Sequence, residues 1–569
     1  MNMKKQIKLL FTTFFLLLTS YSYCQTVYEP ITHDDIYKFL NRMAQKCVIE
    51  YNDQIKPLTR IYIAEKLMEI SKYGIRGKIV TEVEREELDF YLKDYSWERS
   101  AISVQHSEQP INNQMTTNDS LSAEHYTLFN YDPNGRWRLF SYSSDLFKIN
   151  LSPILGYQKG SNDGSSQSHR WNGAYFYGYF SDNIGFSFDF RDNSENGDKI
   201  DRTKNFTPAT GVIVSRSSPS KIEYSEVHTT LSKNWAWGEI TVGKDFLQWG
   251  YAQSGQLVLS QKAPSFPFIR LDIRPTNWLS FNYIHGWLNS DVIDSNETYA
   301  SKRLGQDRTL FRKKYLASHT LTITPTNGLD ISLGESIIYS DRFEISYLMP
   351  LMFFRLADHY LSKNNNNAGD NSQFFLGVSS RNFIKNTHLY GTLFIDEIVT
   401  GSIFDPDKQR NQLGFTLGGS IVDLPVDNLT LTAEYTRILP FAYSHFIPTQ
   451  TYESSSYGLG HWIGYNADLI YGAVNYRFIR GLQATVWGEY VRKGGQGVIE
   501  QQYTLPSQPF LFGLRTNHTY FGADVKYELI HELFARAKFL YHKISSEQTN
   551  GTFLNNSTTE FNFAVYYGL

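Results

Sequence analysis

The sequence predicts a mainly β protein, a large antiparallel transmembrane β-barrel of about 18 strands with a small N-terminal α-helical domain. In its last nine residues, Phe561, Phe563 and Val565 are separated by small or polar residues, which gives one apolar face. An exposed aromatic edge strand invites aggregation in a soluble sheet, whereas a closed barrel in lipid has no edge. We therefore interpret this stretch as the strand that closes the barrel.

The composition agrees with a barrel in lipid. Tyr and Phe number 39 each, and aromatic residues make up 15% of the chain, although only 41% of it is apolar. This combination suits an aromatic-rich lipid-facing band around a polar lumen, although a soluble, aromatic-rich β protein would share it. The formal net charge of −3 offers no basic excess for a nucleic-acid partner.

Residues 1–24 have the organisation of a secretory signal peptide. Three lysines precede an apolar core at residues 9–18, and Cys24 stands before the expected cleavage site. Lipidation of Cys24 is the alternative, but Tyr23 occupies a place where a small residue is expected. Cleavage would leave Cys47 as the only cysteine, without a partner for an internal disulfide or a CxxC metal pair. No later segment has about 18 uninterrupted apolar residues, so we expect no membrane-spanning helix.

Helical spacing of apolar residues follows the signal peptide. Thr32 is expected to cap a first helix and Thr59 a second, and Thr81 with Glu84 has the pattern of a capping box for a third. A polar stretch then separates these helices from the first strands. The expected organisation is a signal peptide (1–24), a periplasmic helical domain (25–99), a linker (100–135) and an outer-membrane β-barrel (136–569).

From residue 147 onward, apolar residues recur with a period of two. In one predicted strand, Ile184 and Phe186 face one way and small or polar residues face the other. In the last strands the opposite face carries charges of both signs, such as Asp524 and Lys538. An apolar face opposite a charged one is what a lipid-facing strand with a wet interior requires.

Short and long connections alternate in this region. Tight turns are expected at residues 181–183, 233–234, 275–277, 325–328, 382–386, 423–428, 479–481 and 530–532. Longer polar stretches, such as residues 192–221 and 441–465, separate them. This asymmetry is typical of outer-membrane barrels, which have short periplasmic turns and long external loops. The count gives about 18 strands with both ends on the periplasmic side.

Residues 242–290, which begin VGKDFLQWGYAQSG, resemble the Wzi family of outer-membrane capsule assembly proteins, in the form found among Bacteroidetes-type sequences. Residues 313–321 (KKYLASHTL), 434–445 (EYTRILPFAYSH) and 463–478 (IGYNADLIYGAVNYRF) fit the same pattern, and the helical start matches in kind. The resemblance implies a large barrel with an N-terminal helical bundle in a Gram-negative envelope. It also implies a lectin-like role, holding exported capsular polysaccharide on the cell surface.

Three tryptophans, Trp249, Trp278 and Trp287, lie in this family-like stretch. Indole faces suit the apolar faces of sugar rings, but Trp also gathers at both membrane interfaces as an anchoring belt. We assign Trp278, beside the turn at residues 275–277, to the belt. Trp249, in a loop, is a candidate polysaccharide contact.

Glu335 interrupts an apolar face, where strict alternation would place its carboxylate in lipid at a cost of roughly 2–4 kcal/mol. Either a bulge turns it inward near Asp341 and Arg342, which makes these three residues candidate polysaccharide contacts, or it lies above the lipid band. Asp396 and Glu397 end a rising strand at the external mouth and are further candidates for binding sugar or a cation. A solvated rim is the alternative for these two carboxylates.

Catalytic motifs are absent from the sequence: it contains no GxSxG nucleophile motif, HExxH zinc pair or phosphate-cradling glycine loop. We therefore predict a non-enzymatic outer-membrane barrel that binds capsular or other surface polysaccharide as a monomer, without metal or cofactor. Its other expected partner is outer-membrane lipid. The rival functions are a porin or solute channel with a helical plug, and an outer-membrane hydrolase or deacylase at the lipid face.

Residues 347–361 (YLMPLMFFRLADHYL) form an unusually apolar connection, which is expected to be covered and not left in water. Pro350 is expected to start a short helix with Asp358 and Leu361 on one face. We predict that this segment folds inward and narrows the external mouth, while the helices of residues 36–95 close the periplasmic end. The alternative is that part of it extends the neighbouring strands above the lipid.

Overall fold

The computed structural model describes residues 26–74, 79–107, 124–181, 183–301, 305, 307–365, 369–381 and 383–568. The expected signal peptide and residues 108–123 of the expected linker lie outside the described residues. Within the part of the chain that is described, no helix is both long enough and apolar enough to cross a membrane.

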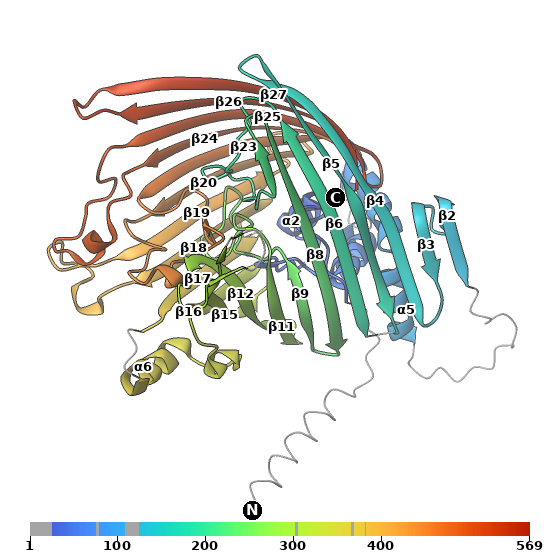
Figure 1. Cartoon of the computed structure of the whole chain (residues 1–569). Helices are drawn as coiled ribbons and strands as arrows, with labels where there is room; N and C mark the ends of the chain where they lie inside the picture. Colours follow the sequence, from blue (N-terminus) through green and yellow to red (C-terminus); the bar gives the residue numbers. More distant parts are fainter. Residues whose placement is uncertain are drawn as a thin grey trace, which may run out of the picture.

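Eighteen strands of the described chain form one closed antiparallel barrel (Figure 1), which confirms the predicted fold class. Each strand pairs with the next barrel strand along the chain, and β27 pairs with β4 to close the ring. The strands are β4 (Phe147–Asn162), β5 (Ser165–Phe180), β6 (Ile184–Asn196), β8 (Lys221–Trp235), β9 (Gly238–Asp245), β11 (Phe266–Thr276), β12 (Leu279–Ile293), β15 (Phe311–Thr326), β16 (Leu329–Ser340), β17 (Asn371–Arg381), β18 (Thr387–Glu397), β19 (Gln412–Val422), β20 (Leu429–Ile438), β23 (Ala467–Ile479), β24 (Leu482–Lys493), β25 (Thr516–Ile530), β26 (Leu533–Glu547) and β27 (Phe553–Tyr567).

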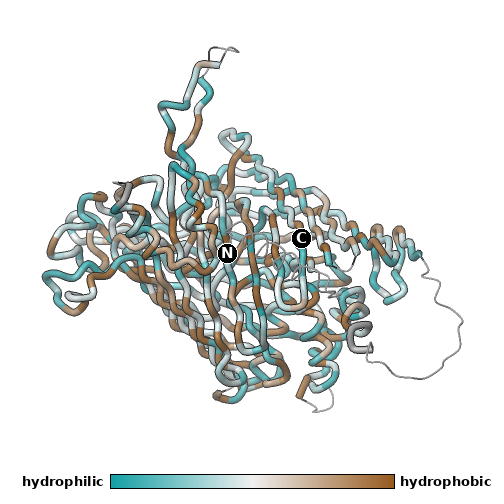
Figure 2. Tube along the Cα trace, turned by 90° about the horizontal axis from the view of Figure 1, so that it is seen from below, coloured by the Kyte–Doolittle hydropathy of each residue, from teal (hydrophilic) through white to brown (hydrophobic). Residues whose placement is uncertain are grey.

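The closing strand behaves as its alternation predicts. Phe561, Phe563 and Val565 are exposed on the outer surface of β27, whereas Asn562 and Ala564 are buried on the lumen side. The same change of polarity from one residue to the next runs along many strands in Figure 2. Because side chains alternate across a strand, this pattern places an apolar band on the outside of the barrel and polar groups inside.

A hairpin of β2 (His125–Tyr131) and β3 (Trp137–Ser143) completes the seam. β27 pairs with the external half of β4 and stops opposite Leu155, and β3 takes over the pairing from Leu151 to Lys148. The periplasmic half of β4 therefore has a partner on both sides. The expected boundary between linker and barrel, at residues 135–136, falls in the turn of this hairpin.

The N-terminal helices are α2 (Asp34–Gln45), α3 (Arg60–Glu69) with the π-helical turn η1 (Ile70–Gly74), α4 (Glu82–Asp94) and α5 (Ser96–Ser107). The Thr81–Glu84 capping box and the Thr59 cap are present as predicted, but His33 and not Thr32 stands at the start of α2. The expected domain boundary at residue 99 falls inside α5. These helices form their own apolar core, separate from the core in the lumen.

The helices close the end of the barrel that carries the short turns. Arg42 on α2 pairs with Asp423 in the turn between β19 and β20, and Arg477 at the end of β23 pairs with Glu87 on α4. The ring of Phe90 on α4 stacks on His531, in the turn between β25 and β26, with centroids 3.6 Å apart. These contacts place the helices across the end of the barrel that carries the short turns.

Long external connections fold into the lumen. The connection between β9 and β11 descends far enough for Trp249, in β10 (Gln248–Trp249), to pair with Ile55, in β1 (Ile55–Lys56). The connection between β20 and β23 joins it, and Tyr443 donates a hydrogen bond to the carbonyl of Leu257 over 2.7 Å. Their apolar residues form one core with the lumen-facing side chains of β11 to β25, so this half of the lumen is filled.

Candidate functional site

The other half of the lumen wall carries an aromatic platform on β5. Trp171 lies opposite Gly156 of β4, and a Cβ at Gly156 would stand only 2.0 Å from Cε2 of the indole. The indole therefore lies over the bare glycine backbone, and it is only partly buried. Tyr566 lies beside it, with ring centroids 5.7 Å apart. A large aromatic face is thus held nearly flush with the lumen wall.

Hydrogen-bonding side chains surround this platform. Gln167 donates to Glu560 over 2.7 Å and to Asn562 over 3.0 Å, both across the barrel seam. His169 Nε2 lies 3.0 Å from Oδ1 of Asn193, the residue that pairs with Trp171 on β6. Amide and carboxylate groups held by their neighbours in this way present donors and acceptors in fixed directions.

Asn193 has an unused donor in this patch. Its side chain is only 5% exposed, and Nδ2 has no hydrogen-bond partner among the described residues. A buried polar atom without a partner is costly, by about 1–3 kcal/mol, so such an atom points to a ligand or water. An aromatic face beside convergent polar groups can stack on an apolar sugar face and bind sugar hydroxyls.

A cavity of about 420 Å³ lies between the N-terminal helices and the barrel, at the end that carries the short turns. Trp235, Trp237, Tyr62 and Arg274 are among its lining residues, and the Arg274 guanidinium lies 4.7 Å from the centre of the Tyr62 ring. Asn234 Oδ1 and Trp235 Nε1 are buried there without a partner in the described chain. This cavity also has the chemistry for a small polar ligand, but it lies away from the external mouth.

The six site residues predicted from sequence do not converge. Trp249 is only 1% exposed and packs inside the filled half of the lumen against Phe375, with ring centroids 5.9 Å apart. Asp396 accepts hydrogen bonds from the backbone N–H of Tyr443 over 2.7 Å and from Gln373 over 3.2 Å, so it ties an inward connection to the wall. Glu397 follows it at the end of β18.

Glu335 lies on the other side of the wall from these residues. β15 and β16 pair without interruption through His319 and Glu335, so the bulge considered from the sequence is absent there and Glu335 keeps its outward direction. Asp341 lies in the connection after β16 and pairs with Arg312 over 3.3 Å, and the neighbouring Arg342 is exposed. The predicted grouping of Glu335 with Asp341 and Arg342 at the lumen mouth is therefore wrong.

The predicted inward fold of residues 347–361 is also wrong. The segment does form a helix, α6 (Phe354–Asn365), preceded by the 3-10 turn η2 (Ile345–Leu348). Its buried residues pack on outward-facing side chains of β12, β15 and β16, such as Tyr283, Tyr315 and Tyr339. Figure 1 shows α6 outside the wall of strands, at the lower left. Apolar residues of the connection find cover on the outer wall because the lumen at this level is already filled.

Sequence reasoning missed the platform because Trp171 stands in an ordinary alternating stretch, SHRWNGAY. The sequence feature that could have indicated the platform is Gly156. Its importance becomes visible only when the register of β4 and β5 shows that it lies opposite Trp171. Among the described residues, no three His, Cys, Asp or Glu side chains are grouped to hold a metal ion.

Comparisons with known proteins agree with this architecture. The family model for the capsule assembly protein Wzi matches residues 174–557. The solved structure of Wzi from Escherichia coli, described as a carbohydrate-binding β-barrel involved in group 1 capsule assembly, is 11% identical, covers 96% of this chain and 100% of its own, and superposes with a TM-score of 0.53. The two chains thus share a fold.

Two other solved structures are less similar. OprD from Pseudomonas aeruginosa is 13% identical, with 74% of this chain and 93% of its own covered and a TM-score of 0.41. OccAB4 from Acinetobacter baumannii is 12% identical, with 77% and 99% covered and a TM-score of 0.40. A search of curated proteins finds no match.

The barrel, its apolar outer band and the family match agree on an outer-membrane location. The matched segment spans more than half of the 569 residues, and the chain belongs to the Wzi family of capsule assembly proteins.

Proposed function

We propose that this protein binds a surface polysaccharide without chemical change and holds it at the external face of the outer membrane. The observation that carries the proposal is the Trp171 platform, an indole laid over Gly156 and flanked by the unused amide donor of Asn193. The E. coli relative, described as a carbohydrate-binding barrel, supports the same ligand class. The mode of action is retention and not catalysis, with one chain as the working unit.

The position of the platform suits a polymer that arrives from outside the cell. Trp171 lies in the external half of β5, between Ser165 at the loop and Phe180 at the periplasmic turn. The connections between β9 and β11 and between β20 and β23 fill the opposite side of the lumen, whereas Trp171 keeps part of its surface exposed on its own wall. We further propose that residues 25–99 form a periplasmic domain that acts as a stopper at the end of the barrel carrying the short turns, following a cleaved signal peptide at residues 1–24.

Binding of the purified barrel to polysaccharide extracted from the producing strain tests this proposal. Trp171→Ala is expected to weaken binding about tenfold or more, and Trp171→Phe to retain most of it, because a phenyl ring keeps a stacking face. Trp278→Ala is the matched control, since Trp278 is exposed at a periplasmic turn. Unchanged binding by Trp171→Ala would exclude the platform, and loss of binding in Trp237→Ala instead would assign the polymer to the periplasmic cavity.

The cellular role has a separate test. A strain that lacks the protein is expected to make and export its polysaccharide but to shed it into the medium. Complementation with Trp171→Ala should restore retention poorly and complementation with Trp278→Ala should restore it fully. Loss of polysaccharide synthesis in the deletion strain would contradict a retention role.

A further inference from the structure

The connection between β16 and β17 forms a strap on the outer wall, which we define as residues 345–365. Beneath it, the outward-facing Tyr283, Ile337 and Tyr339 are buried, together with Tyr347 and Phe354 of the strap itself. Further down the same wall, towards the periplasm, the outward-facing Leu333 is 64% exposed. The strap therefore covers only the external end of the wall, directly above the bare apolar band.

Specific polar contacts hold the strap in place. The backbone N–H groups of Phe354 and Arg355, at the start of α6, donate to the Glu335 carboxylate over 2.8 Å and 2.6 Å. The Tyr283 hydroxyl donates to the carbonyl of Tyr347 over 2.8 Å. A carboxylate that faces outward on a lipid-exposed wall is costly unless it is hydrogen-bonded, and a helix N-terminus supplies both donors and favourable charge. The strap is thus docked and not a loose loop.

The surface of helix α6 that does not contact the barrel carries an apolar stripe and a basic stripe. Phe353, Leu356 and Tyr360 follow one another at helical spacing, and Leu356 and Tyr360 are 62% and 70% exposed. Arg355, His359 and Lys363 recur every four residues on the adjoining surface and are also exposed. At 100° per residue, the apolar stripe and the basic stripe lie next to each other, both turned away from the barrel.

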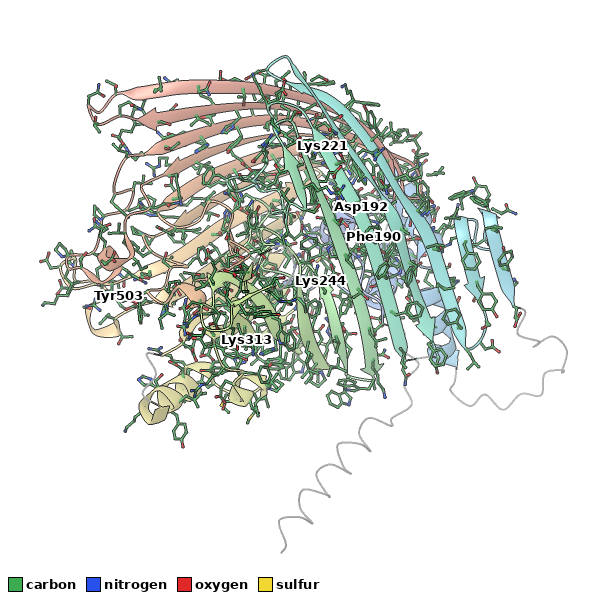
Figure 3. The ribbon with its side chains drawn as sticks, in the orientation of Figure 1. Phe190, Asp192, Lys221, Lys244, Lys313 and Tyr503 are labelled. Carbon is green, nitrogen blue, oxygen red and sulfur yellow. The ribbon has the colours of Figure 1, made fainter. Side chains whose placement is uncertain are left out.

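Lys313 adds a further basic side chain at the external edge of the barrel. It is exposed at the external end of β15, where Figure 3 labels it. The apolar stripe in turn continues the outer band of the strands below it, which is the lipid-facing surface of the barrel. An apolar stripe of this kind would not be left in water, and a helix with adjacent apolar and basic stripes is the pattern of an interfacial membrane helix.

We propose that the strap is a lipid-binding element of the outer leaflet. Phe353, Leu356 and Tyr360 lie against acyl chains, and Arg355 and Lys363 bind the anionic phosphate of a lipid headgroup. Lipid phosphate is the fitting partner because the basic side chains lie at the boundary where headgroups begin. Within the described chain, the Arg355 guanidinium makes only long contacts, of 3.5 Å with Asp358 and 3.4 Å with the Ser372 hydroxyl. The strap then fixes the depth of this side of the barrel in the membrane.

Spin labels test where the strap lies. Single-cysteine variants in a Cys47→Ser background, Leu356→Cys and Tyr360→Cys, are reconstituted in vesicles of phosphatidylcholine with phosphatidylglycerol. We expect both labels to be more accessible to oxygen, which concentrates in lipid, than to a water-soluble nickel complex. A label at Leu333→Cys, in the apolar band, is the lipid-exposed control. Arg216→Cys is the water-exposed control, because Arg216 starts the short strand β7 (Arg216–Ser218) and its side chain is 85% exposed. Water accessibility at both 356 and 360 equal to that at 216 would overturn the proposal.

The headgroup contact has its own measurement. The double variant Arg355→Gln, Lys363→Gln is expected to retain several-fold less phosphatidylglycerol than wild type through detergent washing, whereas phosphatidylcholine retention stays unchanged. Arg216→Gln is the matched charge control, and heat-modifiable gel migration checks that each variant is folded. If the double variant and wild type retain both lipids equally, the basic side chains do not bind lipid phosphate. If, in addition, the labels at positions 356 and 360 are exposed to water, the strap is not a lipid-binding element.

Discussion

The Glu335 carboxylate on the outer wall caps the helix that starts at Phe354, accepting its backbone N–H over 2.8 Å. The residue that looked misplaced in the sequence is therefore the attachment point of the strap. The carboxylate would otherwise stand uncompensated on an apolar wall, and the first backbone N–H groups of α6 would otherwise have no acceptor. The hydrogen bonds between them meet both needs.

Glu335→Ala should release the strap. Two charge-assisted hydrogen bonds disappear, and we expect docking to weaken by about 2 kcal/mol. A spin label at position 356 should become markedly more mobile in this variant, while Glu335→Gln, which keeps an acceptor oxygen, should show a smaller change. Equal mobility in wild type and Glu335→Ala would show that apolar packing alone holds the strap.

Gly156→Ala should damage the polysaccharide platform without adding or removing any polar group. The new Cβ would meet the Trp171 indole at 2.0 Å, so the ring must lift from the wall. We expect about fivefold to tenfold weaker polysaccharide binding, equivalent to about 1 kcal/mol. Gly472→Ala is a control at a barrel glycine with room for a methyl group, where the nearest atom would be 4.0 Å away. Normal binding by Gly156→Ala would argue against stacking on Trp171.

Arg42→Ala should loosen the helical stopper. Arg42 donates to Glu84 over 2.6 Å and also pairs with Asp423, and all three side chains are buried or nearly so. Removing the cation leaves two buried carboxylates with only Lys46 between them, a change that costs about 3–5 kcal/mol. Trypsin cleavage of the helical residues in rising urea should begin at a lower concentration than in wild type. Lys38→Ala, which breaks an exposed pair with Asp34, should shift it little.

Acid should loosen the same stopper. Burial opposes ionisation of Asp94, but Arg136, Arg60 and Arg138 hold its pKa well below its usual range. The pKa of Glu29 is likewise lowered, because Arg60 and His33 outweigh its burial. Since both carboxyls have lowered pKa values in the folded state, their stabilisation is present above about pH 4 and is lost as the pH falls further.

Asp94→Asn separates this effect from general acid damage. The variant should be less stable than wild type at pH 7 but should lose less of its remaining stability between pH 5 and pH 2, as followed by near-ultraviolet circular dichroism. An acid profile with the same slope as wild type would mean that other carboxyls control the transition.

The intact protein should show little steady conductance in planar bilayers, because the inward connections and the helical stopper occupy the lumen. Deletion of residues 250–262 should raise the conductance, since this segment belongs to the lumen filling. Deletion of the strap should not, because it lies outside the wall. Large porin-like currents from the intact protein would favour the transport alternative.

The barrel and its polarity were determined by the sequence alone. The alternation of apolar and polar residues, as at Phe561 and Asn562, depends only on neighbours in the chain. It therefore determines which face of each strand meets lipid and which faces the lumen, before the strand is placed in the barrel. The capping box at Thr81 and Glu84 is equally local, and so is the helix of α6. For the same reason the sequence identified residues 347–361 as a segment that needed cover.

Only the tertiary structure decided which surface provides that cover. Phe354 contacts a wall built from β12, β15 and β16, and the choice between outside and inside depended on the loops between β9 and β11 and between β20 and β23, which already fill the lumen. The Trp171 platform likewise exists because the register of β4 and β5 sets Gly156 beneath the indole. Contacts of this kind join residues far apart in the chain, and their energies depend on register and competing packing, which no single stretch of sequence carries.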